Sequence, residues 1–164
     1  MTEIQIRDAL PEDVPAILRM IRELAAFERQ PDAVVATEAD LLRDGWGPQK
    51  RFGCRMAELD GAVCGFALWF YNYSTWEGRA GIYLEDLYVS PAARGRGVGG
   101  RLIVDLAALA VREGLRRLDL SVLDWNPARD FYHRLGLQHR SDWLSYRVTG
   151  AALQALAESA AADA

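Results

Sequence analysis

The chain has 164 residues, of which 51% are hydrophobic and 26% are charged, and its formal net charge is −4. This length suits one domain that buries about 70% of its unfolded surface, and the acidic balance argues against nucleic acid as the main partner, because phosphate contacts need a basic face. No apolar run is long enough to cross a bilayer, and the N-terminus lacks the pattern of a signal peptide, so we expect a cytoplasmic protein with no membrane partner.

The first half of the chain alternates between strand-like and helix-like patterns. Apolar residues recur every three or four positions from Val14 to Ala25, as they do in a helix that packs one face on a core. Thr37 is a capping residue at the start of a second helical pattern, and Asp60-Gly61 is a two-residue turn signal. In chain order, the predicted elements are a strand at 4–7, a helix at 11–27, a short helix from 37 that ends at 45–48, a hairpin of strands 51–59 and 62–73, and a strand at 82–89.

The two cysteines can be placed on this hairpin. With Asp60-Gly61 as the turn, Cys64 lies opposite Ala57 and Cys54 lies opposite Ala67. The thiols are then about 10 Å apart, at ~3.4 Å per residue, and on opposite faces of the sheet. We therefore expect buried, inert thiols with no disulfide, and no metal site.

The second half of the chain begins with a helical pattern that follows a glycine-rich loop. Its predicted elements are a helix at 98–113 that Gly114 stops, a strand at 118–122, a helix that Asn126 caps and Pro127 begins and that ends at Gly136, a strand at 143–148 and a helix at 150–158. We expect a single domain over 1–158 and a disordered tail over 159–164.

The glycine-rich loop lies between the strand that ends at Val89 and the helix that begins near Val98. Glycines leave backbone N–H groups uncovered, and the first turn of a helix attracts anions through such groups and through its dipole. Two arginines add charged donors. The loop, predicted to hold phosphate, reads Arg94-Gly95-Arg96-Gly97-Val98-Gly99-Gly100.

Two better-known glycine loops fit this segment poorly. A P-loop ends in Gly-Lys-Ser/Thr, whereas this loop continues as Gly99-Gly100-Arg101-Leu102. A dinucleotide loop can be drawn as Gly95-x-Gly97-x-x-Gly100 with Asp119 as the distant acid, but that loop follows the first strand of its fold, and here a long helix and a hairpin come first. A dinucleotide binder stays open as an alternative that predicts affinity for NAD instead of coenzyme A.

The remaining pattern, Arg94-x-x-Gly97-x-Gly99, resembles the acetyl-CoA pyrophosphate loop of the GNAT superfamily of N-acetyltransferases. The resemblance covers nearly the whole chain and is closest to the spermidine/spermine branch, which includes thialysine N-acetyltransferases. The other segments that fit the branch are Ala26-Phe27-Glu28, Thr37-Glu38-x-Asp40-Leu41-Leu42-x-Asp44-Gly45, Tyr83-Leu84-Glu85-Asp86-x-x-Val89 and Trp125-Asn126-x-x-x-x-Phe131-Tyr132-x-x-x-Gly136.

This resemblance implies a fold and a set of partners. The fold is the α/β GNAT fold, with a mixed, mostly antiparallel sheet, helices on both faces, and two central parallel strands that splay apart to admit the pantetheine arm. The implied partners are acetyl-CoA as co-substrate, a small-molecule amine, and a second copy of the chain in a homodimer.

The chemistry of acetyl transfer singles out two side chains. An alkylamine with a pKa near ~10.4 is protonated at neutral pH, so a carboxylate must bind the ammonium and accept or relay a proton, and Glu85 interrupts an otherwise apolar strand. Its neighbour Asp86 points to the opposite face if that strand is regular. The phenol of Tyr132 can donate a proton to a thiolate whose conjugate acid has a pKa of ~8.5. We predict direct transfer in a ternary complex, because neither cysteine has the setting of an acyl carrier.

The resemblance assigns the remaining contacts. Main-chain groups at 87–89 are implied to pair with the pantetheine amides and to hold the thioester oxygen. The implied contacts of acetyl-CoA are Leu87, Tyr88, Val89, Arg94, Gly95, Arg96, Gly97, Val98, Gly99, Gly100, Asn126, Pro127, Ala128 and Arg129. The implied contacts of the amine are Phe27, Glu28, Trp76, Glu85 and Asp86.

Two positions depart from the branch and bear on the choice of amine. Ser74 stands where polyamine acetyltransferases carry an acid two residues before the tryptophan, and Phe27 lacks the usual phenol. A diamine or a lysine-like or thialysine-like amino acid is therefore as good a candidate as a polyamine. The alternatives are a GNAT enzyme for peptide, protein or drug-like amines and a non-catalytic acyl-CoA-binding regulator.

Overall fold

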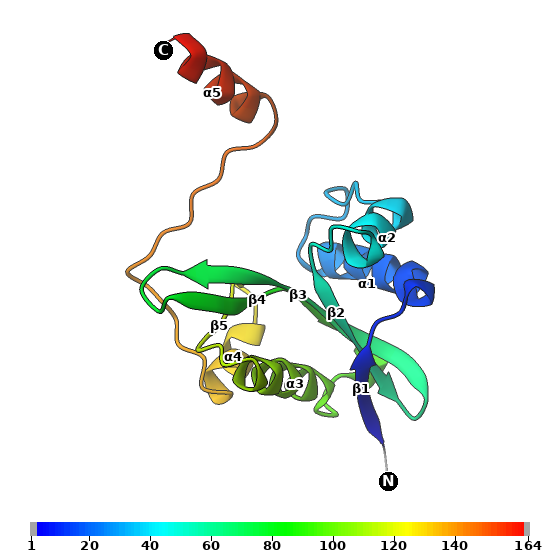
Figure 1. The fold of residues 1–164 in the computed structure, drawn as a ribbon. Helices are drawn as coiled ribbons and strands as arrows, with labels where there is room; N and C mark the ends of the chain where they lie inside the picture. Colours follow the sequence, from blue (N-terminus) through cyan, green and yellow to red (C-terminus); the bar gives the residue numbers. More distant parts are fainter. Residues whose placement is uncertain (1–2, 163–164) are drawn as a thin grey trace. The chain divides into compact units, whose positions relative to one another are not determined.

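The structure is a computed structural model that describes residues 3–162, and the chain divides into two compact units, Met1–Asn126 and Pro127–Ala164. Each unit is drawn in Figure 1. The elements of the first unit are β1 (Ile4–Asp8), a 3-10 turn (Pro11–Asp13), α1 (Val14–Phe27), α2 (Glu38–Trp46), β2 (Gly53–Leu59), β3 (Ala62–Ser74), β4 (Arg79–Val89), a 3-10 turn (Pro91–Ala93), α3 (Val98–Arg112) and β5 (Leu118–Leu120).

The first unit is built on a sheet that has five strands among the described residues, in the order β1-β2-β3-β4-β5. Neighbouring strands are antiparallel except β4 and β5, which are parallel and pair through Ile82 with Leu118 and Leu84 with Leu120. Figure 1 shows α1 and α2 on one face of this sheet and α3 on the other. The mixed, mostly antiparallel α/β fold expected from the sequence is confirmed.

The core fills the space between the sheet and the helices of both faces. The helical apolar stripes predicted from the sequence supply most of it, because their residues lie on one side of each helix. The largest fully buried side chains are Val14, Ile17, Met20, Met56, Phe66, Ile82, Leu84, Val98, Leu102 and Leu106.

One arginine ties the turn before α1 to the sheet. Arg7 of β1 donates two hydrogen bonds to the carboxylate of Asp13, with N–O distances of 2.7 and 2.9 Å, and a third to Glu58. The arginine lowers the pKa of Asp13 through these hydrogen bonds. The start of α1 is thereby tied to the sheet edge, and the far end of α1 is set in position relative to the sheet.

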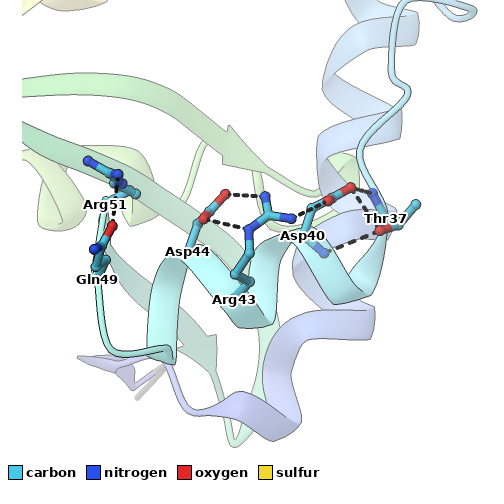
Figure 2. Close-up of polar contacts among 6 residues, drawn as sticks. All are labelled: Thr37, Asp40, Arg43, Asp44, Gln49 and Arg51. Atoms are coloured by element: carbon cyan, nitrogen blue, oxygen red, sulfur yellow. Dashed lines mark hydrogen bonds and ion pairs between the residues drawn. The ribbon is translucent and has the colours of Figure 1, made fainter.

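The helix α2 is held by its cap and by one arginine, as Figure 2 shows. The hydroxyl of Thr37 accepts a hydrogen bond from the N–H of Asp40, and the Asp40 carboxylate accepts one from the N–H of Thr37, which is a capping box. Arg43 bridges Asp40 and Asp44 at 3.0 and 2.8 Å, and the chain after the helix adds a contact between Arg51 and Gln49. Part of the segment that resembles the GNAT branch therefore serves to form a helix.

The hairpin register differs from the prediction by one residue. The turn lies at Asp60-Gly61 as expected, but a bulge shifts the pairing between Glu58 and Ala57, so Cys54 lies opposite Leu68 instead of Ala67. Cys64 is the extra residue of the bulge and has no cross-strand partner in this register. Both thiols are free and buried, as predicted, each 7% exposed.

The described part of the second unit contains α4 (Ala128–Arg134) and α5 (Gly150–Ala162). The cap of α4 is Pro127, one residue later than the Asn126 cap that the sequence predicted. The strand predicted at 143–148 is wrong, because these residues adopt neither helix nor strand. The helix α5 continues beyond residue 158, and residues 163–164 of the predicted tail lie outside the described residues.

Candidate functional site

The end of α1 presents three consecutive side chains to the site. The helix ends at Phe27, and the N–H of Gln30 donates to the carbonyl of Ala25 at 2.8 Å, which turns the chain away from the helix axis. This turn places Arg29 at a φ of 63°, a conformation that glycine adopts more easily. Glu28 lies between these two residues and is half-buried.

A bulge in β4 brings two acidic residues to the same site. Trp69 pairs with Leu84, but the next pair is Leu68 with Asp86, so Glu85 is an extra residue without a cross-strand partner. The sequence-based expectation that Glu85 and Asp86 point to opposite faces required a regular strand, and the strand is not regular here. Bulges of this kind re-aim side chains next to active sites.

Glu28, Glu85 and Asp86 act on one another electrostatically. Burial, together with the charges of Glu85 and Glu28, raises the pKa of Asp86 to about 6. Burial and the charge of Glu85 also raise the pKa of Glu28. These effects indicate that the carboxylates of Glu28 and Glu85 lie near Asp86, and a cation bound among the three would relieve the repulsion. We call these three residues the acidic trio.

Aromatic rings and guanidinium groups stack beside the acidic trio. The rings of Phe27 and Trp125 lie 6.1 Å apart at a tilt of 44°. Arg29 places its guanidinium carbon 3.9 Å from the centre of the Trp125 ring, a favourable cation–π geometry. Trp125 follows β5 in the chain, so this stack ties the end of α1 to the segment after β5.

The side chain of Arg94 reaches towards this stack. Its guanidinium carbon lies 5.4 Å from the ring centre of Phe27 and 5.6 Å from that of Tyr88. Its Nε donates a hydrogen bond to the carbonyl of Val89 at 2.9 Å. Arg94 therefore connects the glycine loop to the ring of Phe27 in addition to any contact that it makes with a phosphate.

The first turn of α3 leaves its N–H groups open, as predicted from the glycine loop. The cap residue Gly97 has a φ of 83°, and no side chain caps the helix. A Cβ added at Gly95, Gly97 or Gly100 would meet no protein atom within 4 Å. Uncapped amides at the positive end of a 15-residue helix, with open space in front of them, fit a diphosphate.

The strands on either side of α3 separate close to Glu85. The pairing of β4 with β5 stops at Leu84 and Leu120, whereas β4 continues to Val89 and pairs with β3 along its other edge. Over residues 85–89 the edge of β4 that faces β5 is therefore not covered by that strand. An extended ligand with amide groups, such as a pantetheine arm, can pair with such an edge.

The remaining predicted site residues belong to the segment that begins at Asn126. Tyr132 lies on α4, is half-buried, and packs its ring 5.3 Å from that of Phe131. Pro127, Ala128 and Arg129 form the cap and first turn of the same helix, which is where the resemblance places a second contact with coenzyme A. Their predicted roles, like that of Asn126, stay predictions.

The structure does not bring Trp76 to the acidic trio. This residue lies in the turn before β4 and is 89% exposed, and Glu85 is six residues along the strand from Arg79, a distance of roughly 20 Å at ~3.4 Å per residue. The sequence analysis, in turn, missed Arg29 and the side chain of Trp125. Trp125 belongs to a segment that resembles the GNAT branch, but no sequence signal showed its contacts with Phe27 and Arg29.

The cysteines lie outside this chemistry. Burial, with the charges of Asp13 and Asp86, raises the pKa of the Cys54 thiol to about 12, so Cys54 is not a nucleophile at neutral pH. Among residues 3–162, no group of three or more His, Cys, Asp or Glu side chains has the arrangement of a metal site. In the same range, no helix is both long and apolar enough to span a membrane.

Comparison with known proteins places this geometry in a family. The model of the acetyltransferase (GNAT) family matches residues 17–137. The thialysine N-epsilon-acetyltransferase of Bos taurus is 41% identical over 169 residues, covering 96% of this chain and 99% of the relative. The spermidine/spermine N(1)-acetyltransferase-like protein 1 of Homo sapiens is 37% identical over 158 residues, covering 90% of this chain and 23% of the relative.

A solved structure shares the fold of this chain. An integron cassette protein from the mobile metagenome of V. cholerae superposes with a TM-score of 0.79 at 26% identity, covering 94% of this chain and 98% of that one. The family resemblance predicted from the glycine loop and its accompanying segments is thus confirmed. The chain belongs to the acetyltransferase (GNAT) family and is an N-acetyltransferase that takes acetyl-CoA as its co-substrate.

Proposed function

We propose that this enzyme acetylates the side-chain or terminal amine of a small diamine, polyamine or lysine-like amino acid, and that the acidic trio binds the amine. The observation that carries the proposal is that the charge of Glu85 reaches both Glu28 and Asp86, so the three carboxylates lie near one another. Glu28 and Asp86, whose pKa values are raised by burial and by neighbouring carboxylates, gain from a bound ammonium group. The similarity to a thialysine acetyltransferase supports an amine that carries an amino acid group at its other end.

Glu85 accepts or relays the proton of the amine. The amine is almost fully protonated at neutral pH and becomes a nucleophile only after it loses a proton. The bulge leaves Glu85 exposed while Asp86 is half-buried. Glu85 can therefore pass the proton to water, while Asp86 and Glu28 hold the charge of the substrate in place.

Acetyl-CoA binds between the glycine loop and the uncovered edge of β4. The N–H groups at 97–100 hold the diphosphate, with Arg96 adding charge. Main-chain groups of Leu87, Tyr88 and Val89 pair with the pantetheine and hold the thioester oxygen. The open first turn of α3 and the end of the β4–β5 pairing at Leu84 support this placement.

Tyr132 donates a proton to the thiolate of coenzyme A as the acetyl group moves directly to the amine. Its place on the helix that Pro127 caps supports this role, since that segment resembles the second coenzyme A contact of the family. A phenol with an ordinary pKa of ~10 is protonated at neutral pH and can protonate a thiolate.

We further propose one acetyltransferase domain over 1–158, in a homodimer located in the cytoplasm. The family match supports the single domain, because residues 17–137 include both sides of the division after Asn126. Exposed aromatic side chains at the end of β3, Tyr71 and Tyr73, support a surface that pairs with a second copy.

The test is thiol release from acetyl-CoA across spermidine, 1,4-diaminobutane, lysine and thialysine. We expect at least one of these amines to release thiol, and we expect Tyr132→Phe to lower kcat by about 10²–10⁴-fold while the affinity for coenzyme A is kept. We expect Glu85→Gln to lower the rate more at pH 7 than at pH 9, where more of the amine is already neutral.

A neighbouring residue provides the control for Tyr132. His133→Gln changes an exposed side chain that points about 100° away around α4 and should leave turnover unchanged. Binding of acetyl-CoA with no thiol release from any amine would contradict the proposal and favour a non-catalytic acyl-CoA-binding regulator. A Tyr132→Phe variant that turns over like the parent would remove the tyrosine from the mechanism.

A further inference from the structure

We propose that Arg29 binds the carboxylate of an amino acid substrate, so that the enzyme prefers diamino acids to diamines of the same length. The proposal rests on the amine site of the proposed function and names its substrate class. The distal ammonium of the substrate lies with Glu85 and Asp86, the α-ammonium with Glu28, and the α-carboxylate with Arg29.

Arg29 is a cation that an aromatic ring holds close to the end of α1, where Glu28 lies. It follows Glu28 in the chain, and its guanidinium lies 3.9 Å from the centre of the Trp125 ring. Trp125 in turn packs on Phe27, the residue before Glu28. The guanidinium is thereby kept at the site by an aromatic surface, instead of extending freely into solvent.

The donors of Arg29 are available to a ligand. Within residues 3–162, no carboxylate forms an ion pair with Arg29, and its side-chain N–H groups donate to no protein acceptor. Arg94, the other arginine of the stack, uses its Nε to hold the carbonyl of Val89. The resemblance assigns the remaining donors of Arg94 to the diphosphate of coenzyme A, whereas Arg29 can offer a two-pronged set of donors to a carboxylate.

The mixture of charges selects against a substrate that carries only cations. A second ammonium of a diamine or polyamine would lie close to the fixed positive charge of Arg29, which lowers its affinity. A diamino acid carries a carboxylate and an ammonium on its α-carbon, and these two groups match Arg29 and Glu28.

The backbone of Arg29 allows the role of its side chain to be separated from folding. Its φ of 63° suits glycine, so Arg29→Gly removes the side chain without straining the turn after α1. Arg29→Gln removes the charge and keeps most of the length. A folding defect that arises in one of these variants is not expected in the other.

The experiment compares a substrate with its decarboxylated partner. The pairs are thialysine with bis(2-aminoethyl) sulfide and lysine with 1,5-diaminopentane, and each pair differs in the carboxylate alone. We expect Arg29→Gln and Arg29→Gly to lower kcat/KM for thialysine by about 10–100-fold, the effect of one lost charged hydrogen-bonding contact. We expect kcat/KM for the matched diamine to rise by up to about fivefold, because a repelling charge is gone.

A second measurement and a control complete the design. Calorimetry of thialysine binding to the enzyme in the presence of coenzyme A should show the same loss of affinity in both Arg29 variants. Arg22→Gln removes an exposed arginine from α1, the helix that ends shortly before Arg29. This control should leave kcat/KM unchanged for both substrates of a pair.

The outcomes separate this proposal from the proposed function. An equal fall for thialysine and its diamine would overturn the role of Arg29, and so would a rise in the KM for acetyl-CoA with every amine, since the anion would then belong to coenzyme A. If the parent enzyme releases no thiol with any amine, the proposed function fails, and the calorimetry alone still decides whether Arg29 binds the carboxylate.

Discussion

At the scale of single residues, the charge of Asp86 lowers the stability of the folded protein and favours binding of an ammonium group. Burial and the charges of its neighbours raise the pKa of Asp86 from an ordinary value of 3.8 to about 6. The folded protein therefore binds this proton more tightly than the unfolded chain does. Asp86 costs no stability below about pH 4, and its cost grows as the pH rises to about 6 and persists above it.

We predict that Asp86→Asn stabilises the protein at pH 8 and not at pH 4. Removing the charge should raise the free energy of unfolding by on the order of 1–3 kcal/mol at pH 8, since one pKa unit corresponds to about 1.4 kcal/mol. The measurement is the melting temperature of parent and variant from pH 4 to pH 8. The same substitution should raise the KM for the amine, because the bound ammonium loses a carboxylate.

Asp13 provides a contrast of opposite sign. Its hydrogen bonds with Arg7 lower its pKa, so its contribution is present above its ordinary pKa and is lost as the pH falls. Asp13→Asn should therefore destabilise the protein most at neutral pH. If both variants shift the melting temperature in the same direction at pH 8, the pKa of Asp86 is not raised in the way described.

Single residues also show where sequence reasoning stops. Glu85 was found because it interrupts an apolar strand before the glycine loop, and Glu28 was found through the resemblance to the GNAT branch. Arg29 was not found, because its importance depends on a left-handed backbone conformation and on a ring that lies 96 positions further along the chain. Neither the backbone conformation nor the distant ring can be recognised from the residues around position 29.

At the scale of elements, the N-terminus of α3 is the part whose function follows most directly from its backbone. We predict that Gly97→Ala weakens coenzyme A binding by about 10–100-fold, the effect of one lost charged hydrogen bond. Gly97 caps the helix with a φ of 83°, a conformation that is strained for alanine. We expect the backbone to shift in response, so that the N–H groups of the first turn no longer align with the phosphates. The measurement is calorimetry with coenzyme A.

The opposite end of α3 offers the matched control. Gly114 has a φ of 69°, and a Cβ there would likewise meet no atom within 4 Å. Gly97→Ala and Gly114→Ala should each cost about 1–2 kcal/mol of folding free energy. Equal losses of coenzyme A affinity in the two variants would show that strain, and not the loop, is responsible.

The elements also show which local features the sequence hides. Periodicity and turn residues predicted the helices and the hairpin of the first unit, because each depends on residues close together in the chain. The bulges at Cys64 and Glu85 were not predicted, since each is decided by pairing with a neighbouring strand. The second bulge matters most, because it places Glu85 beside Asp86 within the acidic trio.

At the scale of the whole molecule, the alternation of residues 143–148 predicted a strand that the described structure lacks. A strand is stable only when another strand accepts and donates its hydrogen bonds. An alternating pattern shows that a segment is able to form a strand, and it cannot show that a partner is present.

The proposed homodimer yields the last prediction. Tyr73 lies near the end of β3 and is 64% exposed, and an exposed aromatic side chain on a strand end is typical of a protein interface. In a symmetric dimer the same surface meets its own copy, so a charge placed in it is repelled by its equivalent.

We expect sedimentation equilibrium to give twice the mass of the chain for the parent, and a lower mass at low concentration for Tyr73→Lys. Val111→Lys replaces another exposed apolar side chain, on α3 and 77% exposed, and should leave the dimer intact. A parent protein that sediments as a monomer at all concentrations would contradict the dimer, and a dimer broken by Val111→Lys alone would move the interface to α3.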